Sequence, residues 1–178
     1  DVILKDRVLN VYEKNNYLYA SSNNEDDLES VVMNYFDLDN DYDKINEYLL
    51  SHDKKLESAV NFSKGLMMIK QDPFETIMEY IISANNSVPS IASALNNIAL
   101  KYGKKVMFND KEYYLFPQYK DLKDVKESDL RECKVGFRDK YLKAMIDKLN
   151  NNEIDLDSFY NMDTKDALDK LMENIGIG

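Results

Sequence analysis

Residues 71–91, Q-D-P-F-E-T-I-M-E-Y-I-I-S-A-N-N-S-V-P-S-I, decide the fold of this chain. Asp72 suits the N-cap of a helix that begins at Pro73, and Glu75 stands where a capping-box carboxylate reaches back to the cap N–H. Apolar residues then recur at helical spacing, so we expect one wide apolar stripe that other helices must cover. The stripe consists of Phe74, Ile77, Met78, Ile81 and Ile82.

This helix is expected to end at Asn85-Asn86, because asparagine tolerates the left-handed conformation that often closes a helix. A second helix can open at Ser87 with Pro89 just inside it. Two carboxamides would then occupy a tight corner between packed helices. They are either plain cap and turn residues or, since a carboxamide carries donors and acceptors, groups that read base edges or fill a gap in a base stack.

Composition limits the class of protein. The chain has 178 residues, of which 44% are hydrophobic, enough for a buried core and one domain or slightly more. Its apolar runs are too short to span a membrane, and no leader pattern opens the chain, so we expect a cytoplasmic protein. We also expect it to act as a monomer. The single Cys133 and single His52 exclude an internal disulfide and a Cys- or His-based metal site, and both are interpreted as structural.

Charge is unevenly distributed along the chain. The formal net charge is −10, which argues against nucleic acid, because phosphate affinity comes mostly from Lys and Arg. Residues 25–47 hold nine acids and only Lys44, a local charge of −8, whereas residues 131–148 hold six bases and three acids, a local charge of +3. The basic stretch is either an ordinary solvated helix face or a contact surface for an anionic partner.

Outward from the central stretch, the sequence predicts an α+β chain that is mostly α. Short strands before residue 20, joined by a turn at Asn15-Asn16, predict part of an antiparallel sheet, and so short a hairpin suggests further sheet upstream. Acid-rich starts then predict three helices. The expected strands are 2–4, 7–12 and 17–19, and the expected helices are 25–35, 41–51 and 53–62.

Downstream, a core helix from Ser87 is expected to close at Gly103, and Asn109-Asp110 predicts a turn between two extended pieces. Residues 126–130 fit a short helix, and G-F-R-D-K-Y at 136–141 opens a longer one. Phe137, at the start of that helix, is either a core aromatic or an exposed wedge. Thr164 can cap a last helix that runs into Ile175-Gly176-Ile177-Gly178.

That final G-I-G after a helix is how a helix-hairpin-helix begins. Two glycines allow a tight turn whose N–H groups face a DNA phosphate, with the positive end of the next helix behind them. A frayed terminus explains the same residues equally well. Gly176 and Gly178 are therefore candidate phosphate contacts.

Three segments together resemble the 8-oxoguanine DNA glycosylase family of the helix-hairpin-helix superfamily, in its bacterial, clostridial-like form. The segments are D-P-F-E-T-I-M-E-Y-I-I-S-A-N-N, V-G-F-R-D-K-Y and L-M-E-N-I-G-I-G, in that order and spacing. The resemblance implies base-excision repair: removal of 8-oxoguanine from damaged double-stranded DNA, with AP lyase activity, in the nucleoid-containing bacterial cytoplasm. It also implies two parts, a partial sheet-plus-helices domain at 1–64 and a helical glycosylase domain at 65–178.

The resemblance assigns roles to individual residues. Asn85 would fill the gap left in the duplex with Asn86 supporting it, Phe137 would be the aromatic wedge, and Arg138 would contact the estranged cytosine, with Lys140 beside them on DNA. The backbone carbonyls of three hairpin residues would hold a structural monovalent or divalent cation, and no other cofactor is implied. These residues are Met172, Asn174 and Ile177.

The chain departs from the family pattern in three places. Ser90 stands where many members have a second cytosine-reading arginine, which implies loose discrimination of the opposite base. The lysine that attacks the sugar and the aspartate that stabilises its charge would lie beyond Gly178, and the second hairpin helix is absent, so the chain is expected to be truncated and inactive alone. The alternatives are another helix-hairpin-helix glycosylase or an acidic helical module that binds proteins.

Overall fold

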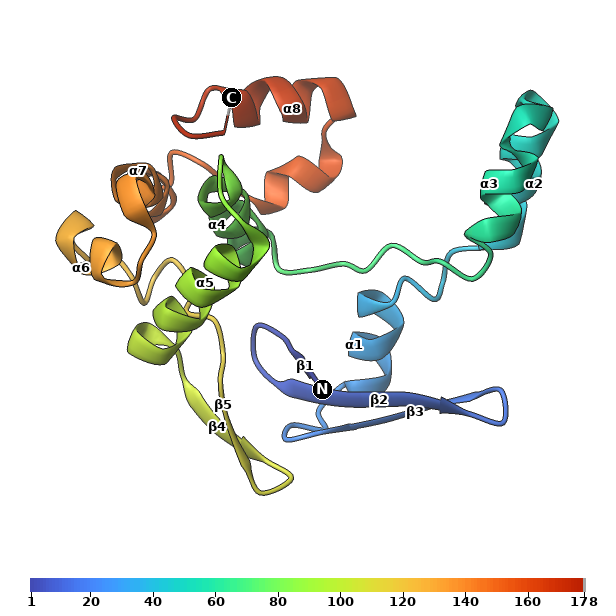
Figure 1. The fold of residues 1–178 in the computed structure, drawn as a ribbon, viewed down its shortest axis with the longest axis horizontal. Coiled ribbons are helices and arrows are strands. Elements are labelled where there is room, and N and C mark those ends of the chain that lie inside the picture. Colours follow the sequence, from blue (N-terminus) through green and yellow to red (C-terminus); the bar gives the residue numbers. More distant parts are fainter. Residues whose placement is uncertain (178) are drawn as a thin grey trace.

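The N-terminal part is a three-stranded antiparallel sheet. A computed structural model describes residues 1–177 (Figure 1), and in it β1 (Val2–Ile3), β2 (Val8–Lys14) and β3 (Tyr17–Ser22) lie in that order. Asn15 and Asn16 both have positive φ, 53° and 61°, which is the backbone of the two-residue turn that best matches strand twist. The predicted turn and antiparallel pairing are confirmed, as is the mostly α class of the α+β fold.

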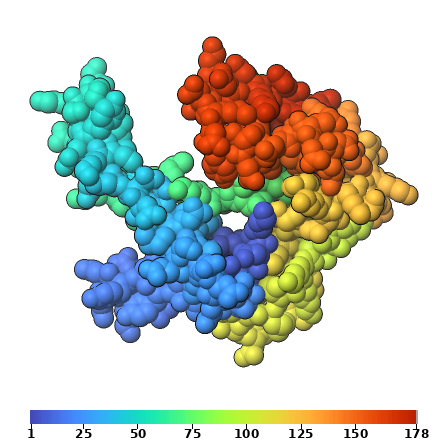
Figure 2. Space-filling model, turned by 180° about the vertical axis from the view of Figure 1, so that it is seen from behind, coloured from blue at the N-terminus to red at the C-terminus, as the bar shows by residue number. Residues whose placement is uncertain are grey.

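Three α-helices and one 3-10 turn follow the sheet. Helix α1 (Leu28–Tyr35) packs on β3, whereas α2 (Tyr42–His52), the 3-10 turn η1 (Lys54–Leu56) and α3 (Glu57–Phe62) form an arm that projects away from the body (Figures 1 and 2). The Asp41 carboxylate caps α2 by accepting from the Lys44 N–H at 3.1 Å. No residue of α2 is buried, and Phe62, the last residue of α3, is 94% exposed.

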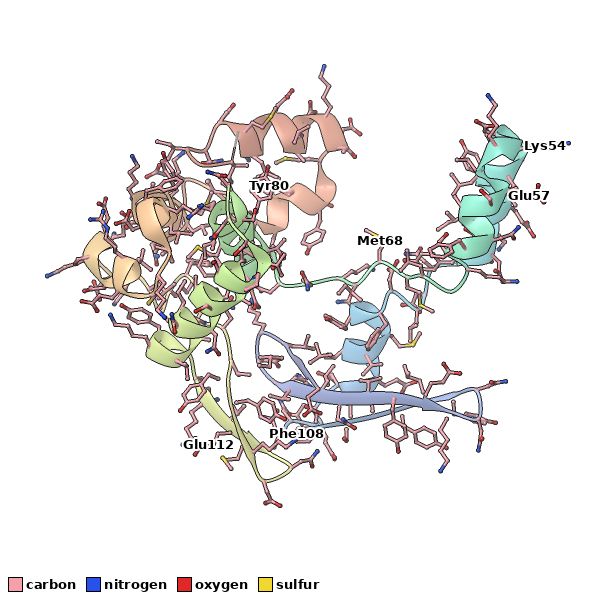
Figure 3. The ribbon with its side chains drawn as sticks, viewed as in Figure 1. Lys54, Glu57, Met68, Tyr80, Phe108 and Glu112 are labelled. Atoms are coloured by element: carbon pink, nitrogen blue, oxygen red, sulfur yellow. The ribbon has the colours of Figure 1, made fainter. Side chains whose placement is uncertain are left out.

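An extended segment, residues 63–72, returns from the arm to the helical body, with Met68 along its course in Figure 3. Its backbone is tied to the N-terminal part at two points. The Met68 N–H donates to the Tyr42 hydroxyl at 2.8 Å, and the Lys70 N–H donates to the Tyr35 carbonyl at 2.9 Å. Lys70 also pairs with Asp37 at 2.5 Å, so three contacts hold this segment in place.

Helix α4 (Pro73–Ser83) begins as the sequence predicts. The Asp72 carboxylate accepts from the Glu75 N–H at 3.0 Å, and Pro73 opens the first turn. The reciprocal half of the expected capping box is not formed within residues 1–177. The apolar stripe of α4 is buried as expected, and it packs on α5 (Val88–Tyr102) and α7 (Asp139–Asn150).

Helix α5 ends at Gly103, as the sequence predicts. The φ of Gly103 is −78°, so no left-handed cap forms. Instead a β-carbon at Gly103 would lie 2.0 Å from the Leu115 carbonyl oxygen and 2.4 Å from that of Ala99. Glycine is required there because the chain leaving α5 runs directly against the backbone of the following hairpin.

That hairpin, β4 (Lys105–Phe108) and β5 (Lys111–Tyr114), turns at Asn109-Asp110 as predicted. It leaves the helical body and reaches the N-terminal sheet, where Phe108, labelled in Figure 3, packs with Val8 and Leu115 in a small second core. Side chains from both sides of the suggested domain boundary at residue 64 therefore pack together: Val8 from the N-terminal part, and Phe108 and Leu115 from the helical part. The N-terminal sheet and the helical body support each other through this hairpin.

The remaining helices complete the body. They are α6 (Glu127–Glu132), the 3-10 turn η2 (Gly136–Arg138), α7, the 3-10 turn η3 (Asp157–Asn161) and α8 (Thr164–Met172). Thr164 is the first residue of α8 and Asp163 takes the N-cap position without a side-chain cap bond, so the predicted Thr164 cap is wrong. Across residues 1–177, no helix combines the length and apolar character needed to cross a membrane.

Candidate nucleic-acid interface

Two segments more than fifty residues apart meet at the end of α4. The side chain of Arg138, on η2, lies against the corner between α4 and α5 and is only 6% exposed. Its Nε donates to the Ala84 carbonyl at 3.0 Å, its Nη2 donates to the carbonyls of Ala84 and of Asn85, the latter at 3.1 Å, and its Nη1 donates to the Val135 carbonyl at 3.2 Å. Arg138 therefore fastens the asparagine corner to η2.

The corner itself uses its two asparagines differently. Asn85 adopts the left-handed conformation, with φ of 49°, and its side chain is exposed. The Asn86 carboxamide is engaged at both ends: its Nδ2 donates to the Ile82 carbonyl at 3.1 Å, and its Oδ1 accepts from the Ser87 N–H at 2.9 Å. Asn86 thus builds the corner, and Asn85 is the amide that the corner presents to solvent.

Phe137 is displayed beside this corner. Its side chain is 57% exposed, so the structure favours the exposed wedge over the core aromatic. The guanidinium carbon of Arg138 lies 4.4 Å from the centre of the Phe137 ring, and the Tyr141 ring meets the Phe137 ring edge-on at 6.4 Å. Cation–π and edge-to-face contacts of this kind orient a ring that solvent would otherwise leave mobile.

Two basic side chains lie on the helices that flank Phe137 in the sequence. Lys140 is exposed in the first turn of α7, with its Nζ 5.0 Å from the Tyr141 ring centre. Arg131 on α6 pairs at 2.6 Å with the buried carboxylate of Asp139, which ties α6 to the start of α7. The spacing of the bases was visible in the sequence, whereas the Arg131–Asp139 pair depends on how α6 and α7 pack and could not be inferred from it.

The predicted hairpin residues contact the same helix, α7. Gly176 has φ of 93°, and a β-carbon there would lie 2.9 Å from Cβ of Tyr141, so the turn fits against α7 only with glycine. Asn174 is 5% exposed, and its Oδ1 accepts from the Lys148 ammonium at 2.7 Å. Helix α7 therefore contacts the Phe137 ring at its first turn and the predicted hairpin turn along its length. Gly178 lies outside the described residues.

The fit of a cation at the hairpin depends on three carbonyls that the resemblance names. The Asn174 carbonyl already accepts from the Ile177 N–H at 3.1 Å. The positively charged Lys148 ammonium donates to the Asn174 side-chain oxygen at 2.7 Å. Both features oppose a cation in this turn conformation. Residues 1–177 contain no cluster of three or more His, Cys, Asp or Glu side chains suited to a metal, and the carbonyls of Met172 and Ile177 remain candidates only.

Cys133 and His52 do not belong to the group of residues around the asparagine corner. Cys133 is 2% exposed, and burial raises the pKa of its thiol above the ordinary value, which makes it a poor nucleophile. His52 is on the projecting arm, and its ring packs against that of Tyr48 with centroids 4.1 Å apart. Neither side chain contacts the asparagine corner or Phe137.

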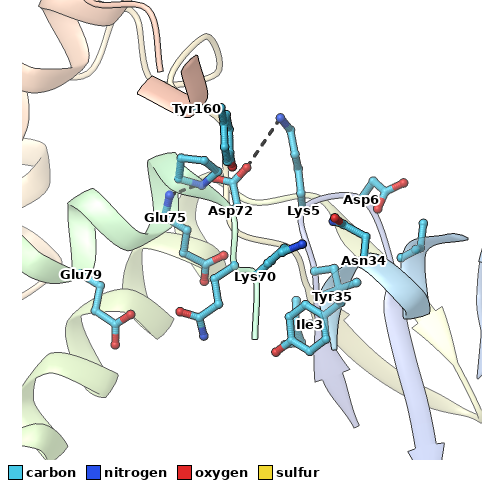
Figure 4. A pocket seen from close by; sticks show the side chains of 14 residues that line it. Ile3, Lys5, Asp6, Asn34, Tyr35, Lys70, Asp72, Glu75, Glu79 and Tyr160 are labelled. Atoms are coloured by element: carbon cyan, nitrogen blue, oxygen red, sulfur yellow. Dashed lines mark hydrogen bonds and ion pairs between the residues drawn. The ribbon is translucent and has the colours of Figure 1, made fainter. Parts of the chain in front are cut away.

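A cavity lies beside the first turns of α4, away from the asparagine corner. It has a volume of about 620 Å³ and separates the N-terminal sheet from the first turn of α4 (Figure 4). Lys5 reaches across it to Asp72 at 3.6 Å. Its lining extends along α4 from Pro73 to Glu79 and does not include the residues of the asparagine corner.

Glu75 lines this cavity, which its position in the first turn of α4 does not predict. Burial, followed by the charges of Asp72 and Glu79, raises the pKa of its carboxyl from 4.5 to about 7. A folded-state pKa above the unfolded one means that the folded protein favours the protonated acid. Ionisation of Glu75 therefore costs stability, and the cost grows as the pH rises from about 4.5 to about 7.

Replacing Glu75 with glutamine should remove this cost. We expect Glu75→Gln to be neutral near pH 4.5 and to raise the free energy of unfolding by about 1–2 kcal/mol at pH 8, a figure reduced for the partial exposure of the carboxyl. Thermal melts at both pH values measure this, with Glu47→Gln on the exposed face of α2 as the control. Equal melting of the Glu75 variant and the parent at pH 8 would contradict the assignment.

Comparison with known proteins agrees with this arrangement. Residues 1–77 match the family model described as 8-oxoguanine DNA glycosylase, N-terminal domain. The fold superposes with a TM-score of 0.90 on the Clostridium acetobutylicum 8-oxoguanine glycosylase/lyase in complex with DNA, at 36% identity over 99% of this chain and 60% of that one.

Curated relatives agree with the structural match. The probable N-glycosylase/DNA lyase of Methanothermobacter thermautotrophicus is 29% identical over 74% of this chain and 48% of its own length. The N-glycosylase/DNA lyase of Saccharomyces cerevisiae is 28% identical over 73% of this chain and 35% of its length. The chain thus spans half or less of these curated relatives, and its sequence and fold are similar to those of the 8-oxoguanine DNA glycosylase family.

Proposed function

We propose that this chain is the duplex-opening part of a base-excision-repair glycosylase that removes 8-oxoguanine from DNA and carries AP lyase activity. One observation supports the proposal above the others. Phe137 and Asn85 come from separate segments, both are exposed, and the buried Arg138 contacts both. An aromatic ring and an amide mounted together on a rigid corner have the chemistry that a wedge and a plug need.

The mechanism follows from the cost of taking a base out of the stack, which is a few kcal/mol. Phe137 inserts beside the lesion and replaces the stacking that is lost when the damaged base turns out of the helix. Asn85 enters the vacated space, where its amide can hydrogen-bond the orphaned base. Both groups are held before DNA arrives, so little ordering entropy is lost on binding.

Charge on the helical body suits the same role. Lys140 lies in the first turn of α7 next to the wedge, and the local charge of residues 131–148 is +3. The acid-rich residues 25–47 lie on α1, α2 and their connections, away from α7 (Figure 1). DNA is thus expected to approach the corner side of the body, and the overall charge of −10 lowers the affinity without preventing the contact.

Binding to duplexes tests this proposal directly. We expect the 178-residue chain to bind a duplex with a tetrahydrofuran abasic analogue more tightly than the matched intact duplex, because the analogue has no base pair to break. The affinity should fall steeply with salt. Fluorescence anisotropy at two or more salt concentrations measures both. Equal affinity for the two duplexes, or no binding at low salt, would contradict the proposal.

The excision step itself needs residues that the resemblance does not place in this chain. The family attacks the sugar C1′ with a lysine amine and forms a Schiff base that borohydride can reduce to a stable adduct. We expect no covalent adduct when the 178-residue chain is incubated with an 8-oxoguanine duplex and borohydride. A trapped protein–DNA band would show that a lysine of this chain can act as the nucleophile.

Ser90 bears on the choice of opposite base. Its hydroxyl lies 2.9 Å from that of Ser87 in the N-cap of α5, and both side chains are exposed at the corner. A serine here cannot supply the bidentate contact of an arginine, which is worth about 1–3 kcal/mol of discrimination. We therefore expect less than about a tenfold spread in affinity for the abasic analogue opposite A, C, G and T.

The variant Ser90→Arg is expected to increase the preference for cytosine, and Ser90→Ala is its size-matched control. Anisotropy with the four duplexes measures both. A strong cytosine preference in the unaltered chain would contradict the prediction.

We further propose that the protein acts as a monomer in the bacterial cytoplasm, on the nucleoid. We also propose that it binds a hairpin cation only when the Asn174 carbonyl is released from its hydrogen bond with the Ile177 N–H.

A further inference from the structure

Tyr141 stands beside several of the groups that the proposed function places on DNA, although it is not itself among the predicted contacts. It follows Phe137 by four residues, in the first turn of α7, and its side chain is half-buried. It packs against the core of the helical body, and so does Ile177 from the predicted hairpin turn, residues 174–177. The Tyr141 side chain therefore belongs partly to the core and partly to the surface beside the wedge.

Three groups contact this side chain. The Phe137 ring meets the Tyr141 ring edge-on, with 6.4 Å between the centroids and 87° between the planes. The Lys140 Nζ lies 5.0 Å from the centre of the Tyr141 ring. A β-carbon at Gly176 would lie 2.9 Å from Cβ and 3.0 Å from Cγ of Tyr141. One side chain thus contacts groups from η2, from α7 and from the predicted hairpin turn.

The predicted hairpin turn packs on Tyr141 through its backbone. Gly176 has φ of 93°, and because it has no β-carbon its main chain lies directly against the Tyr141 side chain. The turn is attached to α7 at a second point, where the Lys148 ammonium donates to the Asn174 Oδ1 at 2.7 Å. Lys148 follows Tyr141 by about two helical turns, so the two contacts together set the position of the turn along α7.

The aromatic character of Tyr141 matters for the two groups on its own side of the molecule. Phe137 is 57% exposed, so its ring depends on its neighbours Arg138 and Tyr141 for orientation. The Lys140 ammonium is attracted to the face of the Tyr141 ring. These contacts are made by the ring, so Tyr141→Phe keeps them, whereas Tyr141→Leu keeps apolar bulk for the core and removes the ring.

We propose that Tyr141 is a positioning residue that holds Phe137, Lys140 and the predicted hairpin turn in one arrangement before DNA binds. The inference rests on the proposed function, because it concerns how the wedge and the turn meet one duplex. Insertion of the wedge distinguishes a duplex with an abasic analogue from an intact one, whereas phosphate contacts are made to both. Loss of the ring should therefore reduce the preference for the duplex with the abasic analogue.

The test measures the ratio of the affinities for the duplex with the abasic analogue and for the matched intact duplex, by fluorescence anisotropy. Tyr141→Leu is expected to lower this ratio roughly threefold to tenfold, and Tyr141→Phe should keep it within about twofold. Tyr102→Leu is the matched control, since Tyr102 is half-buried against the same core and is the last residue of α5, far from the corner where α5 begins. An unchanged ratio in Tyr141→Leu, or an equal loss in either comparison variant, would overturn the inference.

A double variant separates an effect through Phe137 from a general loss of structure. In the background of Phe137→Ala, Tyr141→Leu should lower the affinity ratio no further, because the side chain that Tyr141 orients is already gone. If the two losses multiply instead, Tyr141 does not act through the wedge and the inference fails.

Hydrogen exchange at the Ile177 amide reports on the predicted hairpin turn without DNA. This N–H donates to the Asn174 carbonyl at 3.1 Å. It should exchange faster in Tyr141→Leu than in the unaltered chain or in Tyr141→Phe, and equal exchange in all three would contradict the positioning of the turn. If the unaltered chain bound neither duplex while the exchange result held, the proposed function would fail and the positioning of the turn by Tyr141 would stand.

Discussion

Replacing Phe137 with alanine is expected to lower the affinity for a duplex with an abasic analogue by about tenfold to a hundredfold. Stacking of one base on an aromatic ring contributes roughly 1–3 kcal/mol, and each 1.4 kcal/mol is a factor of ten. Because the Phe137 side chain is 57% exposed, the folded state should lose little stability. Anisotropy titrations and a thermal melt of the same preparation measure the two effects.

Phe62 offers a matched control for this variant. It is the same residue type, is 94% exposed, and lies at the end of α3 on the projecting arm, far along the chain from the corner. Phe62→Ala should leave DNA affinity unchanged. If both variants lost affinity equally, or Phe137→Ala lost none, Phe137 would be an ordinary surface aromatic.

Replacing Gly103 with alanine is expected to destabilise the fold by about 3 kcal/mol or more, or roughly 6–12 °C in Tm for a chain of this size. The added carbon would lie 2.0 Å and 2.4 Å from two backbone oxygens, and backbone cannot move aside as a flexible side chain can. Relief would require the β4–β5 hairpin to shift from α5, which would disturb the small core at Phe108 and Val8.

The neighbouring position provides the control for Gly103. Lys104 is exposed, and only its backbone carbonyl is used, by the Leu115 N–H at 2.9 Å, so Lys104→Ala should melt close to the parent. A melting temperature for Gly103→Ala within about 2 °C of the parent would show that the hairpin can adjust, and that the close approach does not fix its place.

Local patterns of the sequence account for most of the elements. Asp72 caps α4 and Ser87 caps α5, and asparagine pairs form the turn at 15–16, because these residues act on backbone groups within four positions of themselves. The corner at Asn85 and the exposed place of Phe137 were likewise among the predicted outcomes. Signals of this kind need no knowledge of the partner segments.

Other residues have roles that depend on segments distant in the chain. Gly103 closes α5 as expected, but the nearby Leu115 backbone, which the local pattern does not reveal, is the reason that glycine is needed there. Glu75 suggested a capping box, but its carboxyl faces a cavity that residues near both ends of the chain help to line. The resemblance assigns Arg138 a base contact, and the structure adds that its guanidinium donates to the carbonyl of Ala84, the C-cap of α4. The roles of these residues depend on tertiary packing, which cannot be predicted from residue spacing within one segment.

The most direct measurement of the central claim uses 2-aminopurine as the base next to an abasic analogue. The chain contains no tryptophan, so protein fluorescence interferes little. Saturating protein should raise the 2-aminopurine emission because Phe137 enters the stack and separates 2-aminopurine from the neighbouring bases that quench it. Phe137→Ala, brought to saturation at higher concentration, should not raise it. Unchanged emission with the unaltered chain fully bound, or an equal rise with the variant, would contradict the account of a wedge that opens the duplex.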